Sequence, residues 1–118
     1  MELIVDAYEC SETSIADLGT VRAVCERIIE ELQLTVVGKP LWHQFPSPSG
    51  VTGMYLLSES HLTCHTFPEY GLATFNLYCC RSRPEWPWSR HLHQMIGADR
   101  VDVRMVSRGT LQGSARPR

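Results

Sequence analysis

The sequence predicts an α+β fold in which two helices cover one face of a mainly antiparallel sheet, forming a two-layer sandwich. Apolar residues recur at helical spacing between positions 18 and 32, and several short segments alternate apolar and polar side chains as strands do. The chain has 118 residues, of which 43% are hydrophobic and 20% are charged. This length and composition predict one domain over residues 1–118 with a modest hydrophobic core.

The first two predicted elements are a strand and a long helix. Residues 2–8 have the composition of a strand. Residues 11–34 are predicted to be helical, because a stripe of apolar side chains recurs three and four positions apart. The stripe consists of Leu18, Val21, Cys25, Ile28 and Leu32. Ser14 and Asp17 are spaced as in a capping box, so the regular helix is expected to begin there.

The middle of the chain is predicted to form strands. Residues 35–45 contain β-forming residues interrupted by Gly-Lys-Pro at 38–40, which predicts a strand with a bend or bulge. Residues 51–58 and 61–67 are expected to be consecutive strands, and a turn is expected at residues 68–71.

The last third contains the clearest later strand, at residues 72–80. Its alternation places Cys79 on the apolar face and Cys80 on the more polar face, where a site can lie. A second helix is predicted from Pro87 to Gly97, and a final strand is predicted at residues 101–105.

One face of the predicted sheet lacks a cover. The helices cover the other face, while this one is expected to carry aromatic side chains such as Tyr55 together with mixed polar groups. Because that is too much apolar surface for solvent alone, a second copy of the sheet is the expected cover. The sequence therefore predicts a homodimer.

Charge and hydropathy argue against two classes of partner. The net charge of −2 and the pI near 6.2 give no electrostatic reason to expect binding to nucleic acid or to an anionic membrane. The longest apolar runs, such as residues 3–5, are too short to span a bilayer. The N-terminus lacks the basic start and long apolar stretch of a secretory signal, so we expect a soluble cytoplasmic protein.

The cysteines predict neither disulfides nor a metal centre. There are five, and an odd number without an export signal favours reduced thiols. No Cys-x-x-Cys occurs, and adjacent Cys79 and Cys80 point to opposite faces of their strand, which makes them poor zinc ligands.

Reactive side chains concentrate in one short segment. Ser60 lies near His61 and His65, with carboxylates at Glu59 and Glu69. A serine beside a histidine suggests an activated hydroxyl nucleophile. A strand end with turn-forming polar residues explains the same pattern without any chemistry. Hydrolase chemistry is not favoured, because no Gly-x-Ser-x-Gly elbow is present and no aspartate is obviously placed to orient a histidine.

The run from Ser58 to Gly71, SESHLTCHTFPEYG, closely resembles the self-processing segment of bacterial and archaeal S-adenosylmethionine decarboxylases. The resemblance extends upstream through Gly-Val-Thr-Gly at 50–53 and downstream to the strand that ends at Cys80. The first strand, the long helix and the closing strand also follow the order of this family. The resemblance thus covers nearly the whole chain and implies a pyruvoyl-dependent decarboxylase proenzyme.

The resemblance implies self-cleavage between Glu59 and Ser60, which would yield chains 1–59 and 60–118. In this family the serine hydroxyl attacks the preceding carbonyl, and residues matching Thr52 and His65 assist the processing. The serine becomes a pyruvoyl group, which forms a Schiff base with the substrate amine and acts as an electron sink. Cys80 matches the cysteine that returns a proton to the substrate carbon.

The resemblance also implies that the substrate is S-adenosylmethionine and the product an aminopropyl donor for spermidine and other polyamines. Glu69 matches a glutamate that holds the ribose hydroxyls, and Phe45 matches an aromatic near adenine or the sulfonium. Phe67 and Asn76 stand where many relatives carry tryptophan and aspartate, and Phe67 is expected to line the pocket. Glu9 is a further candidate for the substrate site, with a solvated strand end as the alternative.

Two other functions remain open from the sequence. The departures at Phe67 and Asn76 leave room for pyruvoyl-dependent decarboxylation of ornithine or arginine. A metal- or ligand-binding module is a third hypothesis, and its ligands would be His61, His65, Cys64 and Cys80. These four side chains straddle both faces of their strands, which disfavours a closed tetrahedral zinc site.

Overall fold

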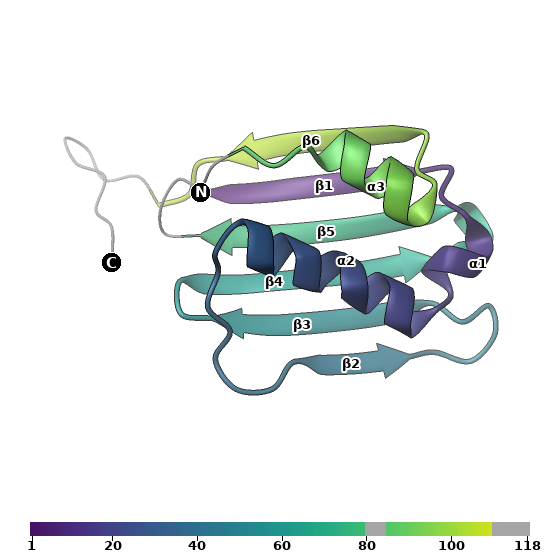
Figure 1. The fold of residues 1–118 in the computed structure, drawn as a ribbon, viewed down its shortest axis with the longest axis horizontal. Helices are drawn as coiled ribbons and strands as arrows, with labels where there is room; N and C mark the ends of the chain where they lie inside the picture. Colours follow the sequence, from purple (N-terminus) through teal and green to yellow (C-terminus); the bar gives the residue numbers. More distant parts are fainter. Residues whose placement is uncertain (80–84, 110–118) are drawn as a thin grey trace.

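A six-stranded sheet forms the framework of the computed structural model, which describes residues 1–79 and 85–109 (Figure 1). Its strand order is β2-β3-β4-β5-β1-β6, and each neighbouring pair is antiparallel. The strands are β1 (Glu2–Tyr8), β2 (Leu41–Gln44), β3 (Val51–Leu57), β4 (Ser60–Phe67), β5 (Leu72–Cys79) and β6 (Arg100–Val106). The predicted α+β class is confirmed.

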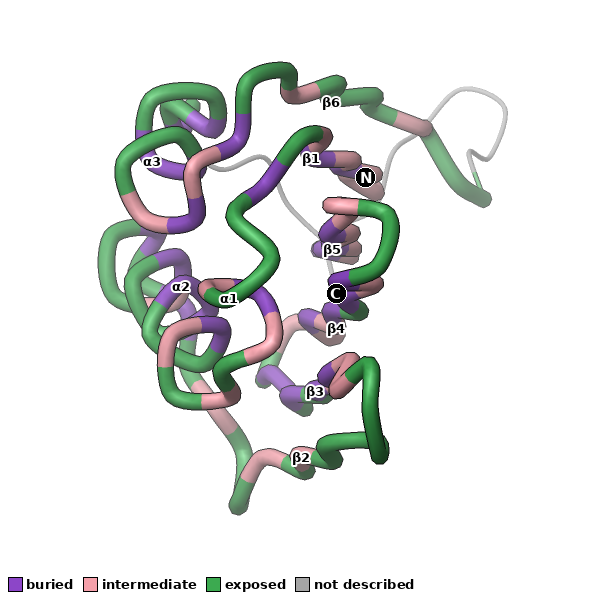
Figure 2. The backbone as a smooth tube through the Cα atoms, turned by 90° about the vertical axis from the view of Figure 1, so that its right-hand side faces the viewer, coloured by how far each residue is buried: buried purple, intermediate pink, exposed green. Residues whose placement is uncertain are grey.

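The helices lie together on one face of the sheet, as Figure 2 shows in a side view. They are α1 (Glu12–Ile15), α2 (Leu18–Glu31) and α3 (Trp88–Ile96), and a short 3₁₀ helix, η1 (Pro68–Tyr70), follows β4. The second predicted helix is confirmed, with Pro87 as its N-cap and Gly97 as its left-handed C-cap.

The single helix predicted over residues 11–34 is wrong in detail, because the structure divides it into α1 and α2. Ser11, rather than Ser14, caps α1, and its hydroxyl accepts a hydrogen bond from the backbone N–H of Ser14. Asp17 then starts a new helix, since its carboxylate accepts from the N–H of Thr20 at 2.9 Å. Three helices therefore cover the face where two were expected.

The strand predicted over residues 35–45 is shorter than expected, because only Leu41–Gln44 is paired along its length, with β3. Gly38 adopts a positive φ of 73°, and Pro40 has no N–H to donate to a ladder. Val36 forms an isolated bridge with Leu57 before this bend.

The core fills the space between the helices and the sheet. Leu62 and Leu77 of the central strands and Ile28 of α2 are at most 1% exposed. Tyr55 also belongs here, so its predicted place on the uncovered face is wrong. Its ring packs edge-on against Trp42 at 5.8 Å, and its hydroxyl donates to Glu26 of α2.

The opposite side of the sheet, which we call the open face, has no covering layer in the described part of the chain (Figure 2). Three apolar side chains on it are strongly exposed: Leu41 at 71%, Met54 at 51% and Leu56 at 61%. Within residues 1–79 and 85–109, every helix is too short or too polar to cross a membrane.

Candidate active site

Ser60 lies at a tight hairpin between β3 and β4. Leu57 pairs with Ser60, so Ser58 and Glu59 form the connection between the two strands. Ser60 has a φ of +139°, a conformation that residues with a Cβ rarely adopt. The backbone is therefore strained at the predicted cleavage point.

Thr52 and His65 form a hydrogen-bonded pair on the open face. They lie directly opposite each other in the register of β3 and β4. Thr52 Oγ1 is 2.6 Å from His65 Nδ1. The structure thus brings together the two side chains that the sequence assigned to processing.

The same register separates this pair from Ser60. His65 is five residues further along the extended strand β4. At about 3.3 Å per residue, the two positions are roughly 16 Å apart. The imidazole of His65 therefore cannot reach the hydroxyl of Ser60 within one chain.

The predicted substrate-binding residues gather at the same end of the sheet as His65. The Phe67 ring lies 5.6 Å from the His65 ring, and Glu69 is exposed in η1, just beyond β4. Phe45 follows β2 and is 46% exposed. Glu9 follows β1, exposed and with a positive φ of 56°. We call this the histidine end of the open face.

The opposite end, which we call the serine end, contains Glu59, Ser60 and the end of β5. Cys79 pairs with Ser60 in the register and is 1% exposed, which confirms its predicted place in the core. Cys80, the predicted proton donor, lies outside the described residues. The sequence-predicted site residues are therefore divided between two ends of one sheet.

A polar network at the serine end was not predicted from the sequence. His61 Nε2 lies 3.2 Å from Asn76 Oδ1, and Asn76 Nδ2 donates to Glu2 Oε2 at 2.7 Å. Arg108 Nη1 donates to the other oxygen of Glu2 at 2.8 Å. The hydrogen bond from Asn76, and then the contact with Arg108, lower the pKa of Glu2. The sequence had singled out His61 beside Ser60, and Asn76 because it stands where many relatives carry aspartate, but nothing in it linked the two to Glu2.

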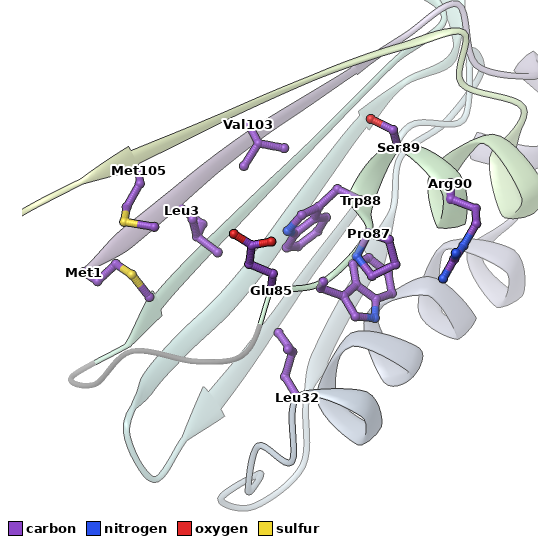
Figure 3. A pocket seen from close by; sticks show the side chains of 11 residues that line it. Met1, Leu3, Leu32, Glu85, Pro87, Trp88, Ser89, Arg90, Val103 and Met105 are labelled. Atoms are coloured by element: carbon purple, nitrogen blue, oxygen red, sulfur yellow. The ribbon is translucent and has the colours of Figure 1, made fainter.

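Two cavities help to locate the site. A hollow of about 360 Å³ on the open face is lined in part by Thr52, His65 and Asn76. A second pocket, of about 510 Å³, lies between the sheet and the start of α3, where Leu3 and Trp88 are among its lining residues (Figure 3). None of the predicted site residues that the structure describes lines this second pocket, so we assign the candidate site to the open face.

The structure gives no support to the metal-binding hypothesis in the part of the chain that it describes. No group of three or more His, Cys, Asp or Glu side chains in those residues is arranged to hold a metal ion. Cys64 is buried and interacts with Cys25 of α2, an interaction that lowers the pKa of the Cys64 thiol. Cys64 thus faces away from the two histidines of its strand.

Comparison with known proteins shows that this chain belongs to a class of enzymes, the decarboxylases. The crystal structure of the adenosylmethionine decarboxylase from Aquifex aeolicus matches with a TM-score of 0.75 and 26% identity, over 98% of this chain and 94% of that one. The family model described as S-adenosylmethionine decarboxylase matches residues 1–109. The chain belongs to this family, which confirms the resemblance noted in the sequence.

Curated relatives agree with this assignment. The S-adenosylmethionine decarboxylase proenzyme of Archaeoglobus fulgidus is 40% identical over 78 residues, covering 66% of this chain and 68% of that protein. The proenzyme of the same name from Thermotoga petrophila is 35% identical over 109 residues, covering 91% of this chain and 82% of that protein.

Proposed function

We propose that this chain is a proenzyme that cleaves itself between Glu59 and Ser60 and then decarboxylates S-adenosylmethionine. The observation that carries the proposal is the positive φ of +139° at Ser60, in a hairpin whose sequence matches the family's processing segment. A strained peptide at a reacting residue is typical of sites where the backbone itself undergoes chemistry. The products would be chains 1–59 and 60–118.

The cleavage can be written with all atoms accounted for. Ser60 Oγ adds to the carbonyl carbon of Glu59, the C–N bond breaks, and the hydroxyl proton passes to the released amine. Removal of the Ser60 α-proton then breaks the Cβ–O bond and releases Glu59 as a carboxylate. The resulting dehydroalanine tautomerises to an imine, which water hydrolyses with loss of ammonia. A pyruvoyl group remains at residue 60.

The residues around Ser60 fit a pyruvoyl group made there. The group consists of the atoms of residue 60 itself, and Ser60 is half-buried at the start of β4 rather than sealed in the core. When present, it supplies a carbonyl that takes up the electrons released with carbon dioxide. In this scheme Cys80 returns a proton to the substrate carbon.

A second copy of the chain would complete the site. His65 and Thr52 cannot reach Ser60 in their own chain, since roughly 16 Å separates the two ends of β4. Two sheets stacked open face to open face, with strands in opposite directions, bring the serine end of one chain against the histidine end of the other. The exposed Leu41, Met54 and Leu56 supply the apolar surface for this contact. We therefore propose a homodimer with two composite sites.

The substrate assignment is supported by residues at the histidine end. The Glu69 carboxylate has two acceptor oxygens and suits a ribose diol, while Phe45 offers an exposed aromatic face to adenine or the sulfonium. Asn76 is occupied by His61 and Glu2, so its departure from the family pattern does not create a new site for a basic amino acid. These contacts favour S-adenosylmethionine over ornithine or arginine.

Intact mass measurement of the purified protein tests the proposal. We expect two chains that meet between residues 59 and 60, with the second blocked by a carbonyl group instead of an amine. Ser60→Ala should remain a single chain, because it removes the nucleophile. An active wild-type protein that stays a single chain of 13.4 kDa, with an unmodified serine at residue 60, would overturn the mechanism.

A further inference from the structure

We propose that His61, Asn76 and Glu2 form an anchor that holds Ser60 in its strained conformation and so sets the rate of self-cleavage. The inference rests on the proposed function, and it assigns these three side chains as positioning residues. The anchor lies on the open face at the serine end and joins β4, β5 and β1.

The chemistry of the groups fixes every donor in the anchor. Glu2 is ionised at neutral pH, since the ordinary pKa of a glutamate, 4.5, lies well below 7 and its contacts lower this pKa further. An ionised carboxylate only accepts hydrogen bonds. The amide nitrogen of Asn76 must therefore point to Glu2, and its oxygen must point to His61. Since an amide oxygen cannot donate, His61 Nε2 carries the proton. The His61 ring is thereby held in one tautomer and one orientation.

The anchor acts at the residue directly after the cleavage point. A positive φ at a serine persists only when the surrounding structure holds it. Ser60 pairs with Leu57 of β3 on one side and with Cys79 of β5 on the other, and these pairings fix the strand register. At the next residue, the anchor ties the side chain of His61 to β5 and β1, so residue 60 cannot relax by shifting the start of β4.

The outer end of the anchor is itself held in place. Arg108, which follows β6, donates to Glu2 at 2.8 Å, and the Glu2 side chain is only 16% exposed. The Arg108 guanidinium lies 5.8 Å from the centre of the Tyr78 ring, and that ring lies 5.6 Å from the His61 ring. Glu2 is therefore a fixed acceptor and not a mobile surface carboxylate.

The anchor also explains how the chain tolerates asparagine at position 76. An aspartate there would accept directly from His61. With asparagine at position 76, the negative charge is on Glu2 instead. Glu2 orients the amide of Asn76, and the amide oxygen in turn orients the ring of His61. In this chain the amide is at position 76 and the carboxylate at position 2. A chain with the carboxylate at position 76 and the amide at position 2 could form the same hydrogen bonds.

The rate of self-cleavage, followed on gels from freshly refolded precursor, tests the anchor without any measurement of decarboxylation. Asn76→Ala removes both hydrogen bonds and should slow cleavage about tenfold. Asn76→Asp sets two carboxylates against each other and should slow it as well. The double variant Glu2→Gln with Asn76→Asp restores a carboxylate–amide pair with its members exchanged, and should return the rate to within about threefold of wild type.

Glu26→Gln is the matched control. It removes the charge of another carboxylate paired with an arginine, Arg22 at 2.7 Å, on α2, and the glutamine oxygen can still accept from the Tyr55 hydroxyl. Its cleavage rate should equal that of wild type. His61→Gln keeps an amide donor that reaches Asn76 and should cleave faster than His61→Ala.

The outcomes separate the two proposals. If the wild type cleaves while Asn76→Ala cleaves equally fast, the anchor is wrong and the proposed function stands. If Asn76→Ala fails to fold, the double variant decides: slow cleavage by a folded double variant, judged by circular dichroism, also overturns the anchor. A wild-type chain that never cleaves overturns both.

Discussion

Thr52 Oγ1 lies 2.6 Å from His65 Nδ1, and the strand pairing that joins these two residues also holds them roughly 16 Å from Ser60. The processing pair and the residue that it is proposed to act on therefore belong to opposite ends of one sheet. This geometry leads to the first prediction below.

Self-cleavage should be complemented between two inactive chains. His65→Ala and Ser60→Ala should each remain uncut alone. In a mixed dimer, the intact histidine end of the Ser60→Ala chain meets the intact serine of the other chain. With equal expression and random pairing, about half of the His65→Ala chains should then be cleaved. Co-expression with different tags, followed by mass measurement of each chain, checks this. Mixed dimers that stay uncut would show that His65 does not act across the interface.

Glu69→Gln should separate substrate use from processing. The change keeps the shape of the side chain but replaces one of the two acceptor oxygens that suit a diol with an NH2 donor, so kcat/KM for S-adenosylmethionine should fall roughly 10- to 100-fold. Self-cleavage should be unchanged. Steady-state carbon dioxide release with S-adenosylmethionine, ornithine and arginine measures the effect. A higher kcat/KM for either basic amino acid on wild-type enzyme would contradict the substrate assignment.

The two adjacent cysteines should behave differently. Cys80→Ala should still cleave itself but turn over slowly, because the proposed proton donor is lost. Cys79→Ala is the matched control. The Cys79 side chain is 1% exposed in the core, so this variant should lower the midpoint of thermal unfolding rather than the turnover rate. Rapid turnover by fully cleaved Cys80→Ala would remove this cysteine from the mechanism.

Glu2 should make folding stability depend on pH in the acid range. The hydrogen bond from Asn76 and the contact with Arg108 lower the pKa of Glu2 below its ordinary value of 4.5. A carboxyl group with a lowered pKa in the folded state contributes stability above its unfolded pKa and loses it as the pH falls through the folded one. Urea unfolding should therefore show that Glu2→Gln is less stable than wild type near pH 7. The difference should shrink as the pH falls below 4.5. A difference that stays constant with pH would contradict this assignment.

Local sequence patterns determined the fold class and the identity of the reactive segment. The alternation along residues 72–79 placed Cys79 in the core, and Pro87 and Gly97 marked the ends of α3, because such features depend only on neighbouring residues. The processing run from Ser58 to Gly71 identified the family on its own. The face predicted for Tyr55 was wrong, because alternation shows which residues share a face of the sheet but does not show which face the helices cover.

Tertiary structure alone decided how the site residues are distributed. Strand pairing set Thr52 against His65 and both far from Ser60, a relation that spacing in the sequence does not reveal. It also joined His61 to Asn76 across 15 positions and Asn76 to Glu2 across 74. The reason is that the register of a sheet is fixed by the packing of the whole face, and a shift of one residue would turn every side chain to the other side.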